Sequence, residues 1–374
     1  MKILYSGGGT MGSVSPLIAI HQRLSAYAHN KPFNAPADRL QVNKKNNVIA
    51  DYRALWLGTH AGPERKIVEK TGIEFKAIAS GKLRRYFDLR NILDLIKINL
   101  GFWQAFFTIL KFKPDVILSA GGFVSVPVAL AGWLLYVPVI IHQQDVHPGL
   151  ANKLMAPFST KITVALDISL KNFSKKKTVL VGNPIRQGLR NKEYGLSNKK
   201  LEFNNNLPIL LVTGGGTGAL AINKLIWESL DELTKFCNII HLTGKNKNNN
   251  KIINNNYKNF EFLKNEMFDA INTANLVISR AGMSSLTELA YLKKPVIIIP
   301  IPNSHQEDNA KYFANKKSCI YLEQKKLTSI KLVQEVKNLL YNKNKQKELS
   351  ENINKIFIDS SGEKIIKEIL DTIK

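Results

Sequence analysis

Short apolar runs that end in glycine or in polar residues recur along this chain. Residues 2–6 (KILYS) lead into GGGT, and a helical pattern follows at 16–27. Residues 208–213 (PILLVT) also lead into GGGT, and a second helical pattern follows at 220–233. A buried strand, a glycine turn and a helix together form the opening of a Rossmann-like unit. Because each half of the chain has one such opening, the sequence predicts an α/β protein with two doubly wound, Rossmann-like domains.

Other apolar runs bounded by Gly or Pro fit the same scheme. They occupy residues 115–122, 137–145, 177–184, 237–244, 276–282 and 295–302. Such runs, alternating with helical stretches, indicate parallel sheets that are buried on both faces. Ligands bind at the carboxyl ends of the strands in these sheets, where the glycines and polar residues lie.

The polar stretch 171–177 favours a domain boundary nearby. We expect a first domain at 1–170 and a second at 171–354. An amphipathic pattern predicts a C-terminal helix at about 355–374, and this helix is a candidate to pack back on the first domain. Residues 30–51 have the composition of a long irregular loop or insertion.

Composition narrows the class of protein. Hydrophobic residues make up 44% of the 374 residues, which is enough for two cores. The two cysteines, Cys237 and Cys319, are far apart, so they predict neither a disulfide framework nor a metal site and favour a reducing compartment. We expect no signal peptide, and no apolar window is long enough to predict a transmembrane helix.

The net charge of +24 has three possible origins. Nucleic-acid binding is the weakest, because no zinc-finger or RNA-binding motif is present. Attraction to anionic lipid and pyrophosphate groups is the second. The third is compositional bias, which the tract 245–259, rich in lysine and asparagine, supports.

Aromatic and cationic residues alternate in the segment 83–112. Its aromatic residues include Phe102, Trp103, Phe106 and Phe107, and its cations include Arg84, Arg85, Arg90 and Lys97. This mixture predicts an interfacial helix on an anionic membrane surface. The alternative is a helix that packs on the sheet.

Glycine turns at helix starts suit phosphate groups, because backbone N–H groups can approach the oxygens closely. The first turn, 7–12, lacks the dinucleotide spacing, so an NAD enzyme is disfavoured. We find no Asp-x-Asp motif and expect no metal and no other cofactor. Arg186 after 182–185 can clamp a diphosphate or lie on the surface. Glu288 can accept hydrogen bonds from ribose or cap a helix with Ser285.

Seven segments together resemble the MurG family of UDP-N-acetylglucosamine–N-acetylmuramyl-(pentapeptide) pyrophosphoryl-undecaprenol N-acetylglucosamine transferases. They are GGGTMGSVSPLIAI, SAGGFVSVPVALA, IHQQDVHPGLANKLMAP, VGNPIR, VTGGGTGALAIN, SRAGMSSLTELA and HQEDNA, in that order. The resemblance implies the GT-B fold, in which two Rossmann-like domains face each other across a cleft. It also implies inverting transfer of N-acetylglucosamine from UDP-N-acetylglucosamine to the 4-hydroxyl of the muramyl sugar of lipid I (undecaprenyl-pyrophosphoryl-muramyl-pentapeptide). The product is lipid II, made for peptidoglycan at the cytoplasmic face of the cell membrane.

The resemblance also assigns substrate-binding residues. They are Thr10, Met11 and Gly12 near the donor sugar and acceptor pyrophosphate; Arg186, Gly216 and Thr217 at the diphosphate; Leu263 and Lys264 at uracil; Met283, Ser284, Ser285, Leu286 and Thr287 beneath the nucleotide; Glu288 at the ribose; and Gln306 at the sugar. A diacylglycerol glycosyltransferase and a catalytically impaired nucleotide-binding protein are the alternative functions.

Two departures from the family pattern concern the catalytic base. Ser13 replaces the usual histidine of the first turn, and Gln143 replaces the usual glutamate of the loop after 137–143. A hydroxyl is a weak base and a carboxamide is no base at all. Ser13, His142 and Asp145 are the catalytic candidates, and His147 lies in the same loop. We favour Asp145, which lies two residues after the missing glutamate and is also assigned to substrate binding, whereas His142 can be purely structural.

Overall fold

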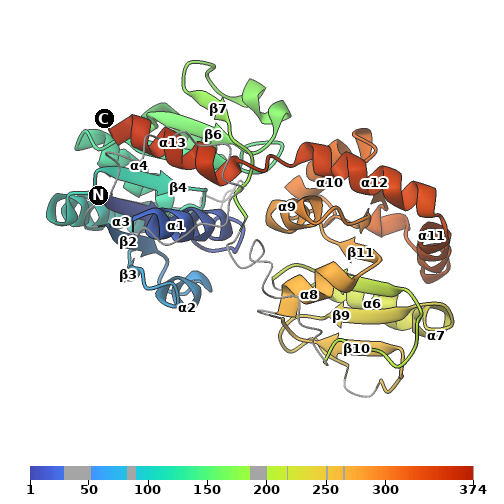
Figure 1. Ribbon diagram of the computed structural model, residues 1–374. Coiled ribbons are helices and arrows are strands. Elements are labelled where there is room, and N and C mark those ends of the chain that lie inside the picture. Colours follow the sequence, from blue (N-terminus) through green and yellow to red (C-terminus); the bar gives the residue numbers. More distant parts are fainter. Residues whose placement is uncertain are drawn as a thin grey trace. The chain divides into compact units, whose positions relative to one another are not determined.

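The computed structural model describes residues 1–28, 52–81, 90–185, 200–216, 218–249, 252–263 and 266–373. Contacts divide the chain into two compact units, Met1–Arg190 with Ile358–Lys374 and Asn191–Phe357. Each unit contains one parallel sheet covered by helices (Figure 1). Both units are therefore doubly wound α/β domains, as the glycine-turn pattern predicts.

The first unit contains a seven-stranded sheet of order β3-β2-β1-β4-β5-β6-β7. Its strands are β1 (Lys2–Ser6), β2 (Arg53–Gly58), β3 (Glu74–Ala77), β4 (Val116–Ser119), β5 (Val139–Gln143), β6 (Lys161–Val164) and β7 (Thr178–Leu180). Its helices are α1 (Ser15–Ala28), α2 (Glu64–Glu69), α3 (Arg90–Phe112), α4 (Ser125–Leu134), α5 (Leu150–Met155) and α13 (Ser361–Ile373), with short 3-10 turns at Ala156–Phe158 and Asp167–Asn172.

The second unit contains a six-stranded sheet of order β10-β9-β8-β11-β12-β13. Its strands are β8 (Ile209–Thr213), β9 (Asn238–Leu242), β10 (Tyr257–Phe260), β11 (Leu276–Ser279), β12 (Val296–Ile298) and β13 (Ile320–Tyr321). Its helices are α6 (Leu220–Glu228), α7 (Leu230–Leu233), α8 (Glu266–Thr273), α9 (Met283–Tyr291), α10 (His305–Asn315), α11 (Ser329–Tyr341) and α12 (Lys343–Ile356), and a 3-10 turn occupies Gln324–Lys326.

Side-chain alternation along β1 builds a core on each face of the first sheet. Ile3 and Tyr5 pack with residues of α1 and with Ile365 and Ile369 of α13, whereas Leu4 packs in the core formed with α3 and α4. Successive strand residues point to opposite faces, so one strand supplies both cores. The sheet order reverses direction between β1 and β4, and between β8 and β11 in the second unit. These two switch points are where ligand sites are expected.

The structure places the first boundary later than 170. The polar stretch 171–177 is the connection into β7, which pairs with β6 and so belongs to the first sheet. The first unit therefore continues to Arg190 and is completed by Ile358–Lys374. Figure 1 shows α13, in red, beside the first unit, and α13 packs against α1, β4 and β6. The predicted loop at 30–51 lies outside the described residues.

Two helix predictions need correction. The helix expected at 220–233 breaks at Ser229, whose hydroxyl donates to the Leu225 carbonyl at 2.7 Å and competes with the helical hydrogen bonds. The helix that contains Glu288 begins at Met283, with Gly282 as its N-cap residue. Glu288 consequently lies beyond the first turn, and the capping alternative for this carboxylate is wrong.

Candidate functional site

The loops that follow β1, β4 and β5 meet at the switch point of the first sheet. The turn after β1 contains Gly9, whose φ of +80° favours glycine, and Thr10, which is exposed. The Gln144 amide after β5 donates to the Gly12 carbonyl at 2.6 Å. Gly122 after β4 has a φ of +94°, and a Cβ atom there would lie 2.8 Å from the Gly8 carbonyl oxygen. The sequence therefore brings Thr10, Met11 and Gly12 to the same edge as the β5 loop.

Ser13 closes the first turn on itself. Its hydroxyl lies 3.2 Å from the Gly8 carbonyl oxygen and 3.1 Å from the Thr10 carbonyl oxygen, and the side chain is buried. A hydroxyl hydrogen directed at these carbonyls holds the turn. This geometry gives Ser13 a structural task at the position where the family pattern has a histidine.

His142 is buried at the end of β5 with both ring nitrogens engaged. Nδ1 lies 3.0 Å from the Thr163 hydroxyl, and Nε2 lies 3.0 Å from the Asn183 carboxamide oxygen. Burial lowers the pKa of His142 from 6.5 to about 4 and outweighs the opposing effect of the Asn183 hydrogen bond. A neutral imidazole bonded on both sides favours the structural role that the sequence left open.

Asp145 lies in the loop that the β5 end holds in place. The Gln143 amide donates to the Asp145 carbonyl at 2.8 Å and to the His147 carbonyl at 3.1 Å, and the Asn152 amide donates to the Gln143 oxygen at 2.6 Å. The Asp145 side chain is half-buried, and His147 is exposed. Gln143 therefore orders this loop from within, and Asp145 is the carboxylate on it.

The second switch point joins the turn after β8 to the start of α9. The Gly215 amide donates to the Thr213 hydroxyl at 3.2 Å, and exposed Gly216 follows. In the described part of the chain no side chain caps α9 at Gly282. The N–H groups at the start of α9 therefore have no side-chain cap, and the helix dipole favours an anion there.

Polar side chains secure the loops around α9. The buried Arg280 guanidinium donates to the carbonyls of Ile299 and Pro300, each at 2.9 Å, and burial lowers its pKa to about 10. The Gln306 carboxamide oxygen accepts from the Ile301 amide at 3.2 Å. The Asn309 amide donates to the Ala281 carbonyl at 3.0 Å. These bonds bring the start of α10 beside the start of α9.

Both halves of the chain match models of glycosyltransferase family 28. The N-terminal domain model matches residues 29–164, and the C-terminal domain model matches residues 209–368. One relative is an N-acetylglucosamine transferase of Clostridium kluyveri, which carries the full name given above for the MurG family. It is 37% identical over 343 residues, covering 90% of this chain and 91% of that protein. The second such transferase of Bacillus cereus is also 37% identical and covers 91% and 92%.

The chain belongs to the MurG family.

Solved structures agree on the fold. MurG of Acinetobacter baumannii covers 99% of both chains with a TM-score of 0.72 at 21% identity. The glycosyltransferase of kitacinnamycin covers 100% of this chain and 98% of its own, with a TM-score of 0.73 at 14% identity. This member of the MurG family therefore has the two-domain GT-B fold.

Most residues assigned by the family motifs lie at the two switch points. In the second unit, Met283, Leu286, Thr287 and Glu288 are buried in α9, whereas Ser284 and Ser285 are half-buried. Leu263 is buried after β10, and Gln306 lies in the first turn of α10. Arg186, Thr217 and Lys264 lie outside the described residues.

Several residues that hold these loops are absent from the motifs. The Trp56 indole donates to the Gly7 carbonyl at 2.9 Å, and Glu64 accepts from the Gly9 amide at 3.2 Å. Both follow the 30–51 segment in sequence, and only the pairing of β1 with β2 brings them to the turn. Among the described residues, no group of three or more His, Cys, Asp or Glu residues is arranged to hold a metal ion.

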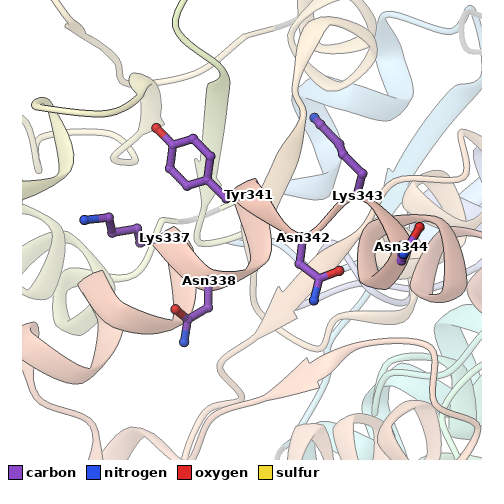
Figure 2. Close-up of a pocket in the computed structure, with 6 residues that line it drawn as sticks. All are labelled: Lys337, Asn338, Tyr341, Asn342, Lys343 and Asn344. Carbon is purple, nitrogen blue, oxygen red and sulfur yellow. The ribbon is translucent and has the colours of Figure 1, made fainter.

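A shallow surface pocket lies elsewhere in the second unit. Figure 2 shows its six lining side chains on α11 and at the start of α12: Lys337, Asn338, Tyr341, Asn342, Lys343 and Asn344. All six are exposed. Since the pocket lies on helices and not at the strand ends, it is separate from both switch points.

The low pKa of His142 predicts a dependence of stability on pH. The unfolded chain binds this proton near pH 6.5 and the native protein only near pH 4, so the stabilisation is complete above pH 6.5 and is lost as pH falls toward 4. The difference corresponds to about 3 kcal/mol at most. Unfolding measured by denaturant at several pH values should show a smaller acid-induced loss in His142→Asn than in the wild type.

The control is His147→Asn, which removes the exposed histidine of the same loop. It should follow the wild-type pH dependence. Equal acid-induced losses in His142→Asn and the wild type would contradict the buried neutral state of His142.

Proposed function

We propose that this protein transfers N-acetylglucosamine from UDP-N-acetylglucosamine to the 4-hydroxyl of the muramyl sugar of lipid I. The observation that carries the proposal is the similarity to transferases of this name over nine-tenths of the chain. Each unit also has a strand, glycine turn and helix at its switch point. The proposal gives the donor to the second unit and the acceptor to the first.

The reaction is a single displacement at the anomeric carbon of the donor. The acceptor oxygen forms a bond to this carbon while its bond to the UDP oxygen breaks, which inverts the configuration. The hydroxyl proton passes to a base, and negative charge grows on the departing UDP. The uncapped start of α9 and the turn at Gly214–Gly216 supply N–H groups suited to that charge, and Arg186 is assigned to the same diphosphate.

Transfer of radiolabelled N-acetylglucosamine to lipid I tests the proposed function. The wild type should convert lipid I to lipid II, with UDP as the second product and without added metal. Diacylglycerol is the competing acceptor, and a product made from it but not from lipid I would identify the alternative lipid glycosyltransferase. Absence of transfer to either lipid, with UDP still bound, would favour the impaired nucleotide-binding protein.

Asp145 is the proposed base and Glu288 the proposed ribose ligand. Asp145→Asn should lower kcat by about 10²–10⁴-fold, the usual contribution of general base catalysis, and leave UDP affinity unchanged. Glu288→Ala should instead weaken UDP binding by about 1.5–3 kcal/mol, because a carboxylate that accepts hydrogen bonds is lost. Steady-state kinetics and calorimetric titration with UDP distinguish the two effects.

The matched control is Glu228→Ala, which removes an exposed carboxylate at the far end of α6 in the same unit. Near-normal turnover in Asp145→Asn would contradict the assignment of Asp145 as the catalytic base. Unchanged UDP affinity in Glu288→Ala would mean that the donor site lies elsewhere.

The surface of α3 supports peripheral binding to an anionic membrane, which we propose to be the cytoplasmic face of the cell membrane. Six large apolar residues of α3 are about half exposed or more: Leu95, Ile96, Leu100, Trp103, Phe107 and Leu110. Lys97, Lys111 and Lys113 are exposed beside them, whereas Ala105 and Ile109 pack in the core. Apolar and cationic groups on one helix suit an interface with anionic headgroups. None of the helices within the described ranges is long and apolar enough to span a membrane.

Vesicle flotation tests this surface. The double substitution of Trp103 and Phe107 by serine removes side chains that are 48% and 62% exposed and should strongly reduce binding to anionic vesicles. The predicted cations Arg84 and Arg85 lie outside the described residues, so Lys97→Glu provides the charge test. Ile330→Ser, which removes an 81% exposed apolar side chain of the second unit, is the control. Flotation of the Trp103 and Phe107 double variant at the wild-type level would contradict the proposal.

A further inference from the structure

A buried carboxylate joins the first glycine turn to the loop after β2. Glu64 begins α2 and has no exposed surface. Its Oε1 atom accepts from the Thr59 amide at 2.8 Å and from the Thr59 hydroxyl, and its Oε2 atom accepts from the Gly9 amide at 3.2 Å. One side chain therefore connects two loops that are about fifty residues apart in sequence.

The surrounding backbone leaves room for the carboxylate alone. A Cβ atom on Gly8 would lie 2.3 Å from Glu64 Oε1, and one on Gly62 would lie 1.9 Å from Oε2. The three hydrogen-bond donors are neutral, so they compensate only part of the cost of burying an ion. A neutral side chain would cost less free energy to bury and would serve if packing were the only requirement. The buried carboxylate therefore points to a role in setting the position of the turn.

The second glycine turn has a different partner. There the Gly215 amide binds the neutral Thr213 hydroxyl of its own strand. In the first turn the Gly9 amide is occupied by the carboxylate of Glu64 from α2. A phosphate group near Gly9 would meet an occupied N–H group and a negative charge. Two turns with the same GGGT sequence are therefore held by different partners, and only the first has a buried carboxylate beside it.

We propose that Glu64 is a positioning residue for the acceptor. It anchors Gly9 to the β2 loop, and thereby holds the exposed Thr10 and Gly12 in the orientation that receives the acceptor. Its charge also directs the acceptor pyrophosphate away from Gly9. This inference rests on the proposed function, which gives the first turn to the acceptor.

Glu64→Gln tests the inference at nearly constant volume. A carboxamide keeps one acceptor oxygen and presents an NH₂ group to the other backbone N–H group, so the link between Thr59 and Gly9 is broken at one of its ends. We expect kcat/KM for lipid I to fall about tenfold or more, while the KM for UDP-N-acetylglucosamine and the affinity for UDP stay within about twofold of wild type. A purely structural role would lower the melting temperature without separating the two substrates.

Glu69→Gln is the matched control, because Glu69 lies on the same short helix but is exposed and paired with Arg65. It should leave both substrates unaffected. If Glu64→Gln does not fold, Thr59→Val removes one donor to the carboxylate and should give a smaller loss, about threefold, again for lipid I alone.

A folded Glu64→Gln enzyme with wild-type kinetics for lipid I would overturn the inference, as would an equal loss for both substrates. With Glu64→Gln unfolded, unchanged lipid I kinetics in Thr59→Val would overturn it as well. Failure of the proposed function is a distinct result, since the wild-type enzyme would then fail to glycosylate lipid I.

Discussion

Close contact between backbones at the carboxyl ends of the parallel strands is the constraint on which both units depend. In the first unit a Cβ atom on Gly122 would lie 2.8 Å from the Gly8 carbonyl oxygen. In the second unit a Cβ atom on Gly218 would lie 2.1 Å from the Thr243 carbonyl oxygen. Both glycines also have positive φ angles. Within each unit, the loops at the carboxyl ends of neighbouring strands can approach one another only because no side chain separates them.

The two GGGT turns show how tertiary partners change the conformation of one local sequence. The positive φ falls on Gly9 in the first turn but on Gly215 and Gly218 in the second. Trp56 of β2 and Glu64 of α2 bind the first turn. The second is held by Thr213 and by Lys247, whose amine donates to the Gly218 carbonyl at 3.3 Å. Sequence repetition therefore marks the two sites without making them equivalent.

The sequence predicts eight strands, including the half-buried edge strand β7, and misses β2 and β6, which are largely buried inside the sheet, as well as β3, β10 and β13. β1, β4, β5, β8, β9, β11 and β12 are almost wholly buried and read as apolar runs. β3 (EFKA) and β10 (YKNF) lie at sheet edges and carry polar residues, so no run marks them. The motifs also single out Glu288 and Asp145, whose roles stay predictions. The residues that bind the first turn come from distant segments, so no motif marks them. Glu64 carries no local signal, and the two hydrogen bonds of His142 depend on Thr163 of β6, which pairs with β5, and on Asn183 of the loop after β7.

The return of the chain to the first unit has a consequence for folding during synthesis. Ile365 and Ile369, near the C-terminus, share a core with Ile3 and Tyr5, near the N-terminus. The second unit, by contrast, is continuous in sequence from Asn191 to Phe357. As the ribosome makes the chain, the second unit is complete while the first still lacks the helix that covers its sheet. The first unit can therefore be completed only after Ile358–Lys374 has been made, and until then the part of the sheet that α13 covers stays open.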